Sequence, residues 1–256
     1  MSSEIILLIK IFDNEEYADA FINEGKMYCR TLETFKGIDD DGVRGDKFEA
    51  ASCWYQPDQI TMDLSYVDDK NIQKSIQLTG ADLAGPIVMQ PSIYNHLNLY
   101  CMYAVKKPEF HESYETEEER ILAVEKINTM LQEIITLDDD ALSLGEFSVI
   151  VFKTQDFIEK VKQTLVDNKY KCNHNLVQYF DPETFNGDFN ELETVFRKRK
   201  IYEPQNEYRF VIQPPESEPI AHKTIYIGSL EGIAVKVPTR KINSAMHLKL
   251  ATPTND

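Results

Sequence analysis

The sequence lacks several features that would assign it to a class at once. Its apolar runs are only a few residues long, so no segment is predicted to cross a membrane as a helix. The first residues carry an acidic side chain where a secretory signal would carry basic ones, and we interpret them as the start of a strand. The four cysteines form no CxxC pair, which predicts a reduced, cytoplasmic protein.

The short motifs of many enzymes are missing too. There is no GxSxG, no P-loop and no GxGxxG, which argues against the common hydrolase and nucleotide-binding loops. The five histidines show no HxH or HxxxH spacing, and "KCNH" at residues 171–174 offers too few ligands for zinc. The turn "IDDDG" lacks the alternating ligands and the final glutamate of an EF-hand loop. None of these patterns therefore predicts a metal site.

Positive charge is scarce. The chain has 27 Lys and Arg against 43 Asp and Glu, a net charge of −16. This disfavours binding to nucleic acid through a broad basic face, because neutralisation of phosphates supplies most of that affinity. One small basic island remains at Arg197 to Lys200, which could steer a phosphate backbone locally.

The hydrophobic patterns predict an α+β fold, with mixed, largely antiparallel sheets flanked by a few helices. We expect one domain over residues 1–256 with insertions. The predicted strands are 4–12, 27–32, 59–67, 71–78, 97–105, 146–152, 174–180, 206–213, 223–229 and 231–237. The predicted helices are 13–24, 116–135 and 154–167. The loop around residues 137–146 is the best candidate for a domain boundary.

Three details of these elements can be checked. Asp13 or Asn14 is expected to cap the first helix and Gly25 to end it. Thr116 and Glu119 form a capping box before the second helix. Two apolar sets are expected to face a core: Ile60, Met62, Leu64 and Tyr66 of a half-buried strand, and Ile121, Val124, Ile127, Met130, Leu131 and Ile134 of that helix. Trp54 is also predicted to be a core residue.

The stretch "RKRKIYEPQNEYRFVI" (residues 197–212) is the first candidate site. In a strand, Tyr208, Phe210 and Ile212 would point into the core, and Gln205, Glu207 and Arg209 would share the opposite face. A carboxylate beside an amide can hold a sugar hydroxyl and stabilise a developing oxocarbenium ion. The alternative is a solvated edge strand with a Glu207–Arg209 ion pair of little energetic weight.

A second candidate site lies in "YCRTLETFKGIDDDGVRGDKFEA" (residues 28–50). It gathers Arg30, Arg44, Asp46 and Glu49 around a turn that is rich in glycine. Arginines in this setting can clamp a pyrophosphate, and glycines let the backbone approach a ligand closely. The alternative is a flexible surface turn that happens to be charged.

Taken in order, the two stretches resemble a widespread family of uncharacterised bacterial proteins. Members carry a Phe-Asn-Asp-Pro-Phe-Glu-like turn near the N-terminus, which Asp46, Phe48 and Glu49 match in part. They also carry a C-terminal block of a lysine, an aromatic residue, two acidic positions and an arginine. This chain matches that block with Lys198, Tyr202, Gln205, Glu207 and Arg209, with tyrosine where tryptophan is usual and glutamine where glutamate is frequent.

The C-terminal block also resembles the Gln/Glu-x-Glu element of ADP-ribosyltransferases. That resemblance implies NAD as a substrate, with Glu207 orienting the nicotinamide ribose and Gln205 helping to select the acceptor. It also implies that basic and aromatic side chains surround NAD. The candidates are Lys10, Tyr28, Arg30, Arg44, Tyr202 and Arg209.

Three classes of function are therefore open. The resemblance implies an ADP-ribosyltransferase-like toxin or effector in conflict between bacteria and phages, which modifies a protein or nucleic-acid acceptor and can be matched by a neutralising or regulatory protein. The second class is a non-catalytic interaction or sensor protein of phage defence or counter-defence, whose acidic surface binds a basic partner. The third is a nuclease or another phosphate-handling enzyme that uses Asp46 and Glu49 with a metal.

Overall fold

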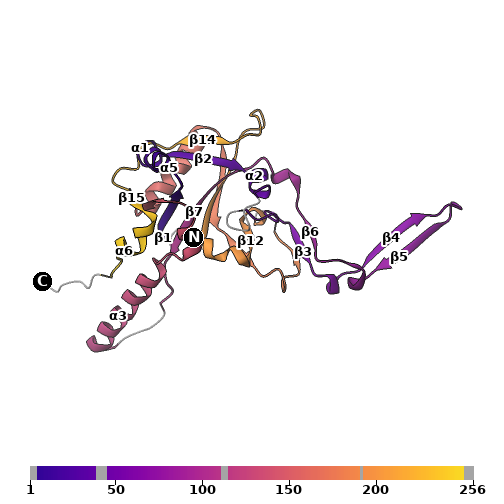
Figure 1. Ribbon diagram of the computed structural model, residues 1–256, viewed down its shortest axis with the longest axis horizontal. Helices are drawn as coiled ribbons and strands as arrows, with labels where there is room; N and C mark the ends of the chain where they lie inside the picture. Colours follow the sequence, from indigo (N-terminus) through magenta and orange to yellow (C-terminus); the bar gives the residue numbers. More distant parts are fainter. Residues whose placement is uncertain (1–4, 39–44, 111–114, 191–192, 251–256) are drawn as a thin grey trace. The chain divides into compact units, whose positions relative to one another are not determined.

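The computed structural model describes residues 5–38, 45–110, 115–190 and 193–250 (Figure 1). It is mixed α+β, with several antiparallel sheets and few helices, which confirms the predicted fold class in this coarse form. The chain divides into two compact units. The first comprises residues 1–29, 98–176 and 204–256, and the second comprises residues 30–97 and 177–203.

The first unit is built on a sheet that has eight strands in the part of the chain that the structure describes. β7 (Asn98–Lys106) is central and pairs antiparallel with β1 (Ile5–Phe12) and β13 (Glu207–Gln213). The sheet continues in the order β14-β2-β7-β1-β8-β15, and β9 pairs with β13. The remaining strands are β2 (Lys26–Thr31), β8 (Phe147–Val151), β9 (Lys171–Leu176), β14 (Lys223–Tyr226) and β15 (Ala234–Pro238).

Two helices cover one face of this sheet. α1 (Glu15–Glu24) begins where the Asn14 side chain accepts a hydrogen bond from the Glu16 amide at 2.7 Å, and it ends at Gly25, as predicted. α5 (Thr154–Asp167) buries an apolar stripe against the same face. The main core of the unit lies between the helices and the strands. Its large, fully buried side chains include Phe21, Phe157, Phe210, Leu8, Met27 and Leu165.

A smaller core lies on the opposite face. Ile9, Val105 and Ile150 of the strands pack there with residues that follow α3 and with two short helices. These helices are α4 (Asp139–Leu142) and α6 (Ile242–Ala245).

α3 (Glu117–Ile134) has the predicted capping box. The Thr116 hydroxyl accepts from the Glu119 amide at 3.2 Å, and the Glu119 carboxylate accepts from the Thr116 amide at 3.1 Å. The predicted apolar face of this helix is buried only in part. Leu131 is buried, whereas Ile121 is 51% exposed, so the expectation was wrong for Ile121. Hydrophobic spacing identifies a face of a helix, and it does not show what covers that face.

The second unit has an aromatic core. β3 (Cys53–Tyr55) pairs with β6 (Ile87–Met89) and β11 (Gly187–Asp188), while β10 (Gln178–Phe180) runs parallel to β12 (Arg197–Arg199). Trp54 is 4% exposed and its indole donates to the Pro182 carbonyl at 3.0 Å, which confirms it as a core residue. Its ring contacts those of Phe48 and Phe180, and Phe180 in turn contacts the rings of Phe185 and Phe189.

Short helices connect the strands. α2 (Leu32–Lys36) follows β2. The 3-10 turns of the described residues are Pro57–Gln59, Gly80–Asp82, Ser92–Tyr94, Thr194–Phe196, Lys200–Gln205 and Thr239–Lys241.

β4 (Met62–Val67) and β5 (Gln73–Leu78) form a separate two-stranded ribbon in the second unit. The prediction that β4 is half-buried was wrong, because all six of its residues are exposed. The predicted strand 174–180 is also divided, since β9 and β10 belong to different units. No helix of the described residues is long and apolar enough to cross a membrane.

Candidate functional site

The Glu207 and Arg209 side chains share one face of β13. Arg209 Nε donates to Glu207 Oε1 at 2.7 Å, and Arg209 is 1% exposed and Glu207 5% exposed. β13 is an interior strand with β7 on one side and β9 on the other, so the alternative of a solvated edge strand was wrong. Tyr208, Phe210 and Ile212 lie in the main core, as predicted.

Gln205 is not on the strand. It ends the 3-10 turn Lys200–Gln205, and Asn206, with φ of 38°, separates that turn from β13. The alternation of side chains begins only at Glu207, so the predicted strand position of Gln205 was wrong. The geometry of a strand therefore does not set the Gln205 amide beside the Glu207 carboxylate.

Polar groups from neighbouring strands accompany the pair. Residues directly opposite one another in an antiparallel pair share a face, and the register sets Glu207 opposite Tyr103 and Arg209 opposite Asn175. The Asn206 side-chain amide donates to the Tyr103 hydroxyl at 3.2 Å, and burial raises the pKa of Tyr103. We call Tyr103, Asn175, Glu207 and Arg209 the polar row.

Lys10 lies on the other face of this sheet. Its ammonium group donates to the Cys101 carbonyl at 2.7 Å and lies 4.7 Å from the centre of the Tyr100 ring. Tyr100 is opposite Phe210 in the register and belongs to the main core. Lys10 and Glu207 are therefore on different faces of the sheet.

The other predicted NAD-binding residues are dispersed. Tyr28 is 51% exposed on β2, and its ring centre is 5.6 Å from that of His222. Arg30 is exposed on the same strand, and Arg44 lies outside the described residues. Tyr202 belongs to the second unit, whereas Glu207 belongs to the first.

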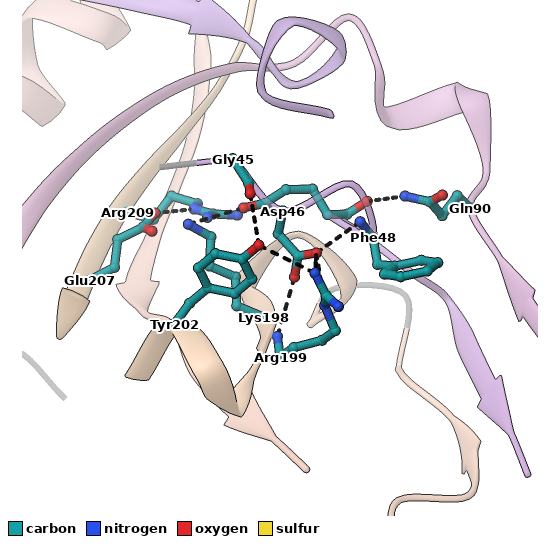
Figure 2. A network of polar contacts seen from close by, with 10 residues as sticks. Gly45, Asp46, Phe48, Gln90, Lys198, Arg199, Tyr202, Glu207 and Arg209 are labelled. Atoms are coloured by element: carbon teal, nitrogen blue, oxygen red, sulfur yellow. Dashed lines mark hydrogen bonds and ion pairs between the residues drawn. The ribbon is translucent and has the colours of Figure 1, made fainter. Parts of the chain in front are cut away.

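Within the second unit, residues far apart in the sequence form a largely buried charge network (Figure 2). Arg199 reaches Asp46 Oδ1 with Nε at 3.0 Å and with a terminal nitrogen at 2.8 Å. Asp46 is fully buried, and it also accepts from the Phe48 amide at 2.9 Å, which fixes the turn that carries it. The two contacts between Arg199 and Asp46 hold the guanidinium in one orientation.

Tyr202 completes this network. Its hydroxyl donates to the Gly45 carbonyl at 2.8 Å and accepts from Arg199 at 3.2 Å. Burial, and then the negative charge of Asp46, raise the pKa of Tyr202. The Arg199 guanidinium lies 4.8 Å from the Phe48 ring centre and 5.5 Å from that of Tyr202, so both rings contact the cation.

A second ion pair lies beside the first. Lys198 Nζ is 3.2 Å from Glu49 Oε1, and these side chains are 3% and 0% exposed. The Gln90 side-chain amide donates to the carbonyls of Lys47 and Glu49 at 2.9 Å each. Asp46 and Glu49 are therefore fixed and buried, and the alternative of a flexible surface turn is wrong for this part of the stretch.

The network joins residues that the sequence presented as two separate stretches. Asp46 and Glu49 come from the first, and Lys198, Arg199 and Tyr202 from the second. Sequence reasoning missed the role of Arg199, Tyr103 and Asn175. The only sequence signal for Arg199 is that the stretch with Asp46 and Glu49 is acidic and the stretch at residues 197–200 is basic, so their charges are opposite.

The carboxylates of this network are held by cations of the chain itself. In the ranges that the structure describes, no group of three or more His, Cys, Asp or Glu residues is arranged to hold a metal ion. The four cysteines all lie in those ranges and form no disulfide bond with one another, and burial raises the pKa of the Cys172 thiol to about 12.

No protein-family model matches the chain, and no curated protein or solved structure matches it either.

Proposed function

We propose that this chain acts by binding a protein partner, and that the paired charged residues of its two candidate stretches are structural. One observation carries this proposal: Asp46, Glu49 and Glu207, the buried acidic residues of the two stretches, each have a cationic partner. The distances are 2.8 Å for Asp46–Arg199, 3.2 Å for Glu49–Lys198 and 2.7 Å for Glu207–Arg209.

The energetics favour a structural role for these pairs. A carboxylate that is to stabilise a cationic ribose or to bind a metal must direct its negative charge at that group, and here an arginine or a lysine already compensates it. Removing one member of a buried pair leaves an uncompensated charge, at a cost of about 3–5 kcal/mol. Such pairs therefore fix the arrangement of the elements that carry them.

Charge indicates the chemistry of the partner. The chain carries −16, so a basic protein surface is attracted and an acidic one is repelled. The first half of α3 offers a suitable surface. Its exposed face carries Glu117, Glu118, Ile121, Leu122 and Glu125.

This face of α3 combines charge with apolar anchors. Ile121 is 51% exposed and Leu122 is 65% exposed. The carboxylates of Glu117 and Glu118 lie one helical turn before these two residues, and that of Glu125 lies one turn after them. Carboxylates would orient a basic partner, and burial of the two apolar side chains would supply affinity. In the setting that the sequence resemblance implies, the partner is a protein of phage defence or counter-defence.

The test uses a synthetic amphipathic peptide of lysine and leucine as a basic probe. Fluorescence anisotropy should detect binding to the full chain that weakens with added salt, because salt screens exposed charges. Leu122→Ser should weaken binding several-fold. Val166→Ser is the matched control, since Val166 is 67% exposed on α5. Equal affinity for the two variants would contradict the assignment to α3.

A second candidate function is an NAD-using transferase or glycohydrolase of ADP-ribosyltransferase-like fold, and the polar row favours it. The Glu207 carboxylate has a fixed orientation, and Tyr103 and Asn175 supply a hydroxyl and an amide on the same face. Groups of this kind bind ribose hydroxyls. Lys10 lies on the other face of the sheet, so it is not part of this candidate site.

The reaction in this second candidate would be dissociative. The bond between the ribose carbon and the nicotinamide nitrogen breaks, and nicotinamide leaves with the electron pair. The negative charge of Glu207 stabilises the cationic ribose until a protein side chain, a nucleic-acid base or water attacks it and loses a proton.

Nicotinamide release from NAD by the purified chain separates the two candidates. If the chain acts only by binding a protein partner, no nicotinamide is released. If the chain is an NAD-using enzyme, nicotinamide is released, and Tyr103→Phe and Glu207→Gln each abolish the release. Glu218→Gln should leave it unchanged, although Glu218 also has ion-pair and hydroxyl partners in the first unit, Lys223 and Tyr170. Circular dichroism of each variant shows whether a loss of turnover is a loss of folding.

A further inference from the structure

The β4–β5 ribbon has two faces of different chemistry. The register pairs Met62 with Leu78, Leu64 with Ile76 and Tyr66 with Lys74, and these residues share one face. The intervening pairs, Asp63 with Gln77 and Ser65 with Ser75, share the other. We call the first set the apolar face of the ribbon.

The apolar face is open to solvent. The exposed fractions are 37% for Met62, 50% for Leu64, 40% for Tyr66 and 47% for Ile76. Figure 1 shows the ribbon projecting beyond β3 and β6 of the same unit. The two strands form a sheet of their own. A two-stranded ribbon in water is at best marginally stable, so a cover on its apolar face would stabilise it.

Hydrogen bonds and an ion pair of Asp68 hold the turn at the end of the ribbon. The Asp68 carboxylate accepts from the amides of Lys70 and Ile72 at 2.9 Å and 3.0 Å, and it pairs with Lys74 at 2.9 Å. The hydrogen bond from Lys74 and those from the two amides lower the pKa of Asp68. The turn thus fixes the register, and a preorganised surface loses less conformational entropy on association.

Charge indicates which occupant fits. The two strands contain one acidic residue, Asp63, and one basic residue, Lys74, so their net charge is zero. The whole chain carries −16. Two copies of such a chain repel one another over most of their surface because both are acidic. The repulsion is smallest where the surface is neutral, so the apolar face of the ribbon is where two copies can approach. A strongly basic partner would favour the acidic surfaces instead.

We propose that the apolar face of the ribbon packs against the same face of a second copy of this chain. The contact is isologous, so each residue of the face meets the face of the partner across a twofold axis. Strands of six residues are about 20 Å long, which limits the buried area. The interface is therefore small, and the dissociation constant is expected between about 10 µM and 1 mM.

The experiment is sedimentation velocity of the full chain at concentrations from about 5 µM to about 500 µM, which span this expected range. The weight-average sedimentation coefficient of the wild type should rise with concentration. Leu64→Lys combined with Ile76→Lys should remain monomeric throughout. These changes make the chain less acidic, so general repulsion between copies cannot explain a loss of association.

Ser65→Lys combined with Ser75→Lys is the matched control. This variant places two lysines opposite one another at the neighbouring pair of the same strands, on the other face of the ribbon. It should therefore destabilise the hairpin about as much as the Leu64→Lys and Ile76→Lys variant does. This variant should associate like the wild type. The proposal is overturned by a wild type that stays monomeric, by association that persists in the first variant, or by equal loss in both.

Discussion

Arg209 and Glu207 are two residues apart on one strand, and the 2.7 Å bond between them lies in the interior of the protein. Side chains two apart on a strand point to the same face, so the strand itself brings them together. The pair is nevertheless buried, which is unusual for charged groups and makes each one depend on the other.

This dependence gives the first prediction. Glu207→Gln removes a charge but keeps an acceptor near Arg209, and it should lower the free energy of unfolding by about 3–5 kcal/mol. The double variant with Glu207→Gln and Arg209→Met should lose less free energy of unfolding than the sum of the losses in the two single variants. The reason is that neither charge of the pair remains unpaired in the double variant. Urea unfolding followed by circular dichroism measures this coupling. Strict additivity would show that the two charges do not stabilise one another.

The network around Asp46 predicts that arginine and lysine are not interchangeable at residue 199. Arg199→Lys keeps the charge but loses the two-point contact with Asp46 and the flat surface that meets Phe48 and Tyr202. The expected loss of stability is about 1–3 kcal/mol, measured by urea unfolding. Arg240→Lys, at an exposed position, is the control and should change stability by less than about 0.5 kcal/mol.

The pH dependence of stability can be predicted at His174. Its Nδ1 is 2.5 Å from the Tyr208 hydroxyl, and Lys162 and Glu159 of α5 are the charged groups that act on it. Burial, and then the positive charge of Lys162, lower the pKa of His174 below its ordinary 6.5. The unfolded chain therefore takes up a proton at a higher pH than the folded chain does.

The sign of the effect follows from this difference. The contribution of His174 is fully present above its unfolded pKa of 6.5 and is lost as the pH falls through the folded pKa. Stability should thus decrease from about pH 7 to about pH 5, and His174→Gln should show a smaller decrease. Urea unfolding at a series of pH values is the measurement. An equal decrease in the variant would assign the pH dependence to other groups.

The secondary structure was predictable where local signals agree. For α1, the capping Asn14, the apolar stripe and the terminal Gly25 all define the same helix. β7 was recognisable as a central strand because its apolar run is nearly continuous, as in strands that are covered on both faces. The coarse fold class followed from such elements.

Other features could not be predicted, for physical reasons. Alternation in β4 shows which residues share a face, but exposure depends on whether another element covers them. Gln205 was misplaced because a 3-10 turn that contains Pro204 interrupts the extended chain just before Glu207. The contact between Asp46 and Arg199 joins residues 153 positions apart, and the pattern of one sequence does not encode such a pairing.

Gly25 supports the last prediction. Its φ of 63° is in the left-handed region, and a Cβ atom there would lie 2.3 Å from the Gly228 carbonyl oxygen and 2.5 Å from Ile227 Cγ1. The backbone between α1 and β2 therefore approaches the segment after β14 more closely than any side chain allows. Gly25→Ala combines this clash with an unfavourable backbone conformation, and it should destabilise the chain by more than about 3 kcal/mol.

Gly85→Ala is the matched control for Gly25→Ala. A Cβ atom at Gly85 would meet no other atom within 4 Å. This change should leave stability within about 1 kcal/mol of the wild type, because alanine mainly restricts the unfolded chain. Thermal unfolding by calorimetry compares the two variants. Similar midpoints would show that the chain at Gly25 can move away from Gly228 and Ile227, and that the close approach is not required for the fold of the first unit.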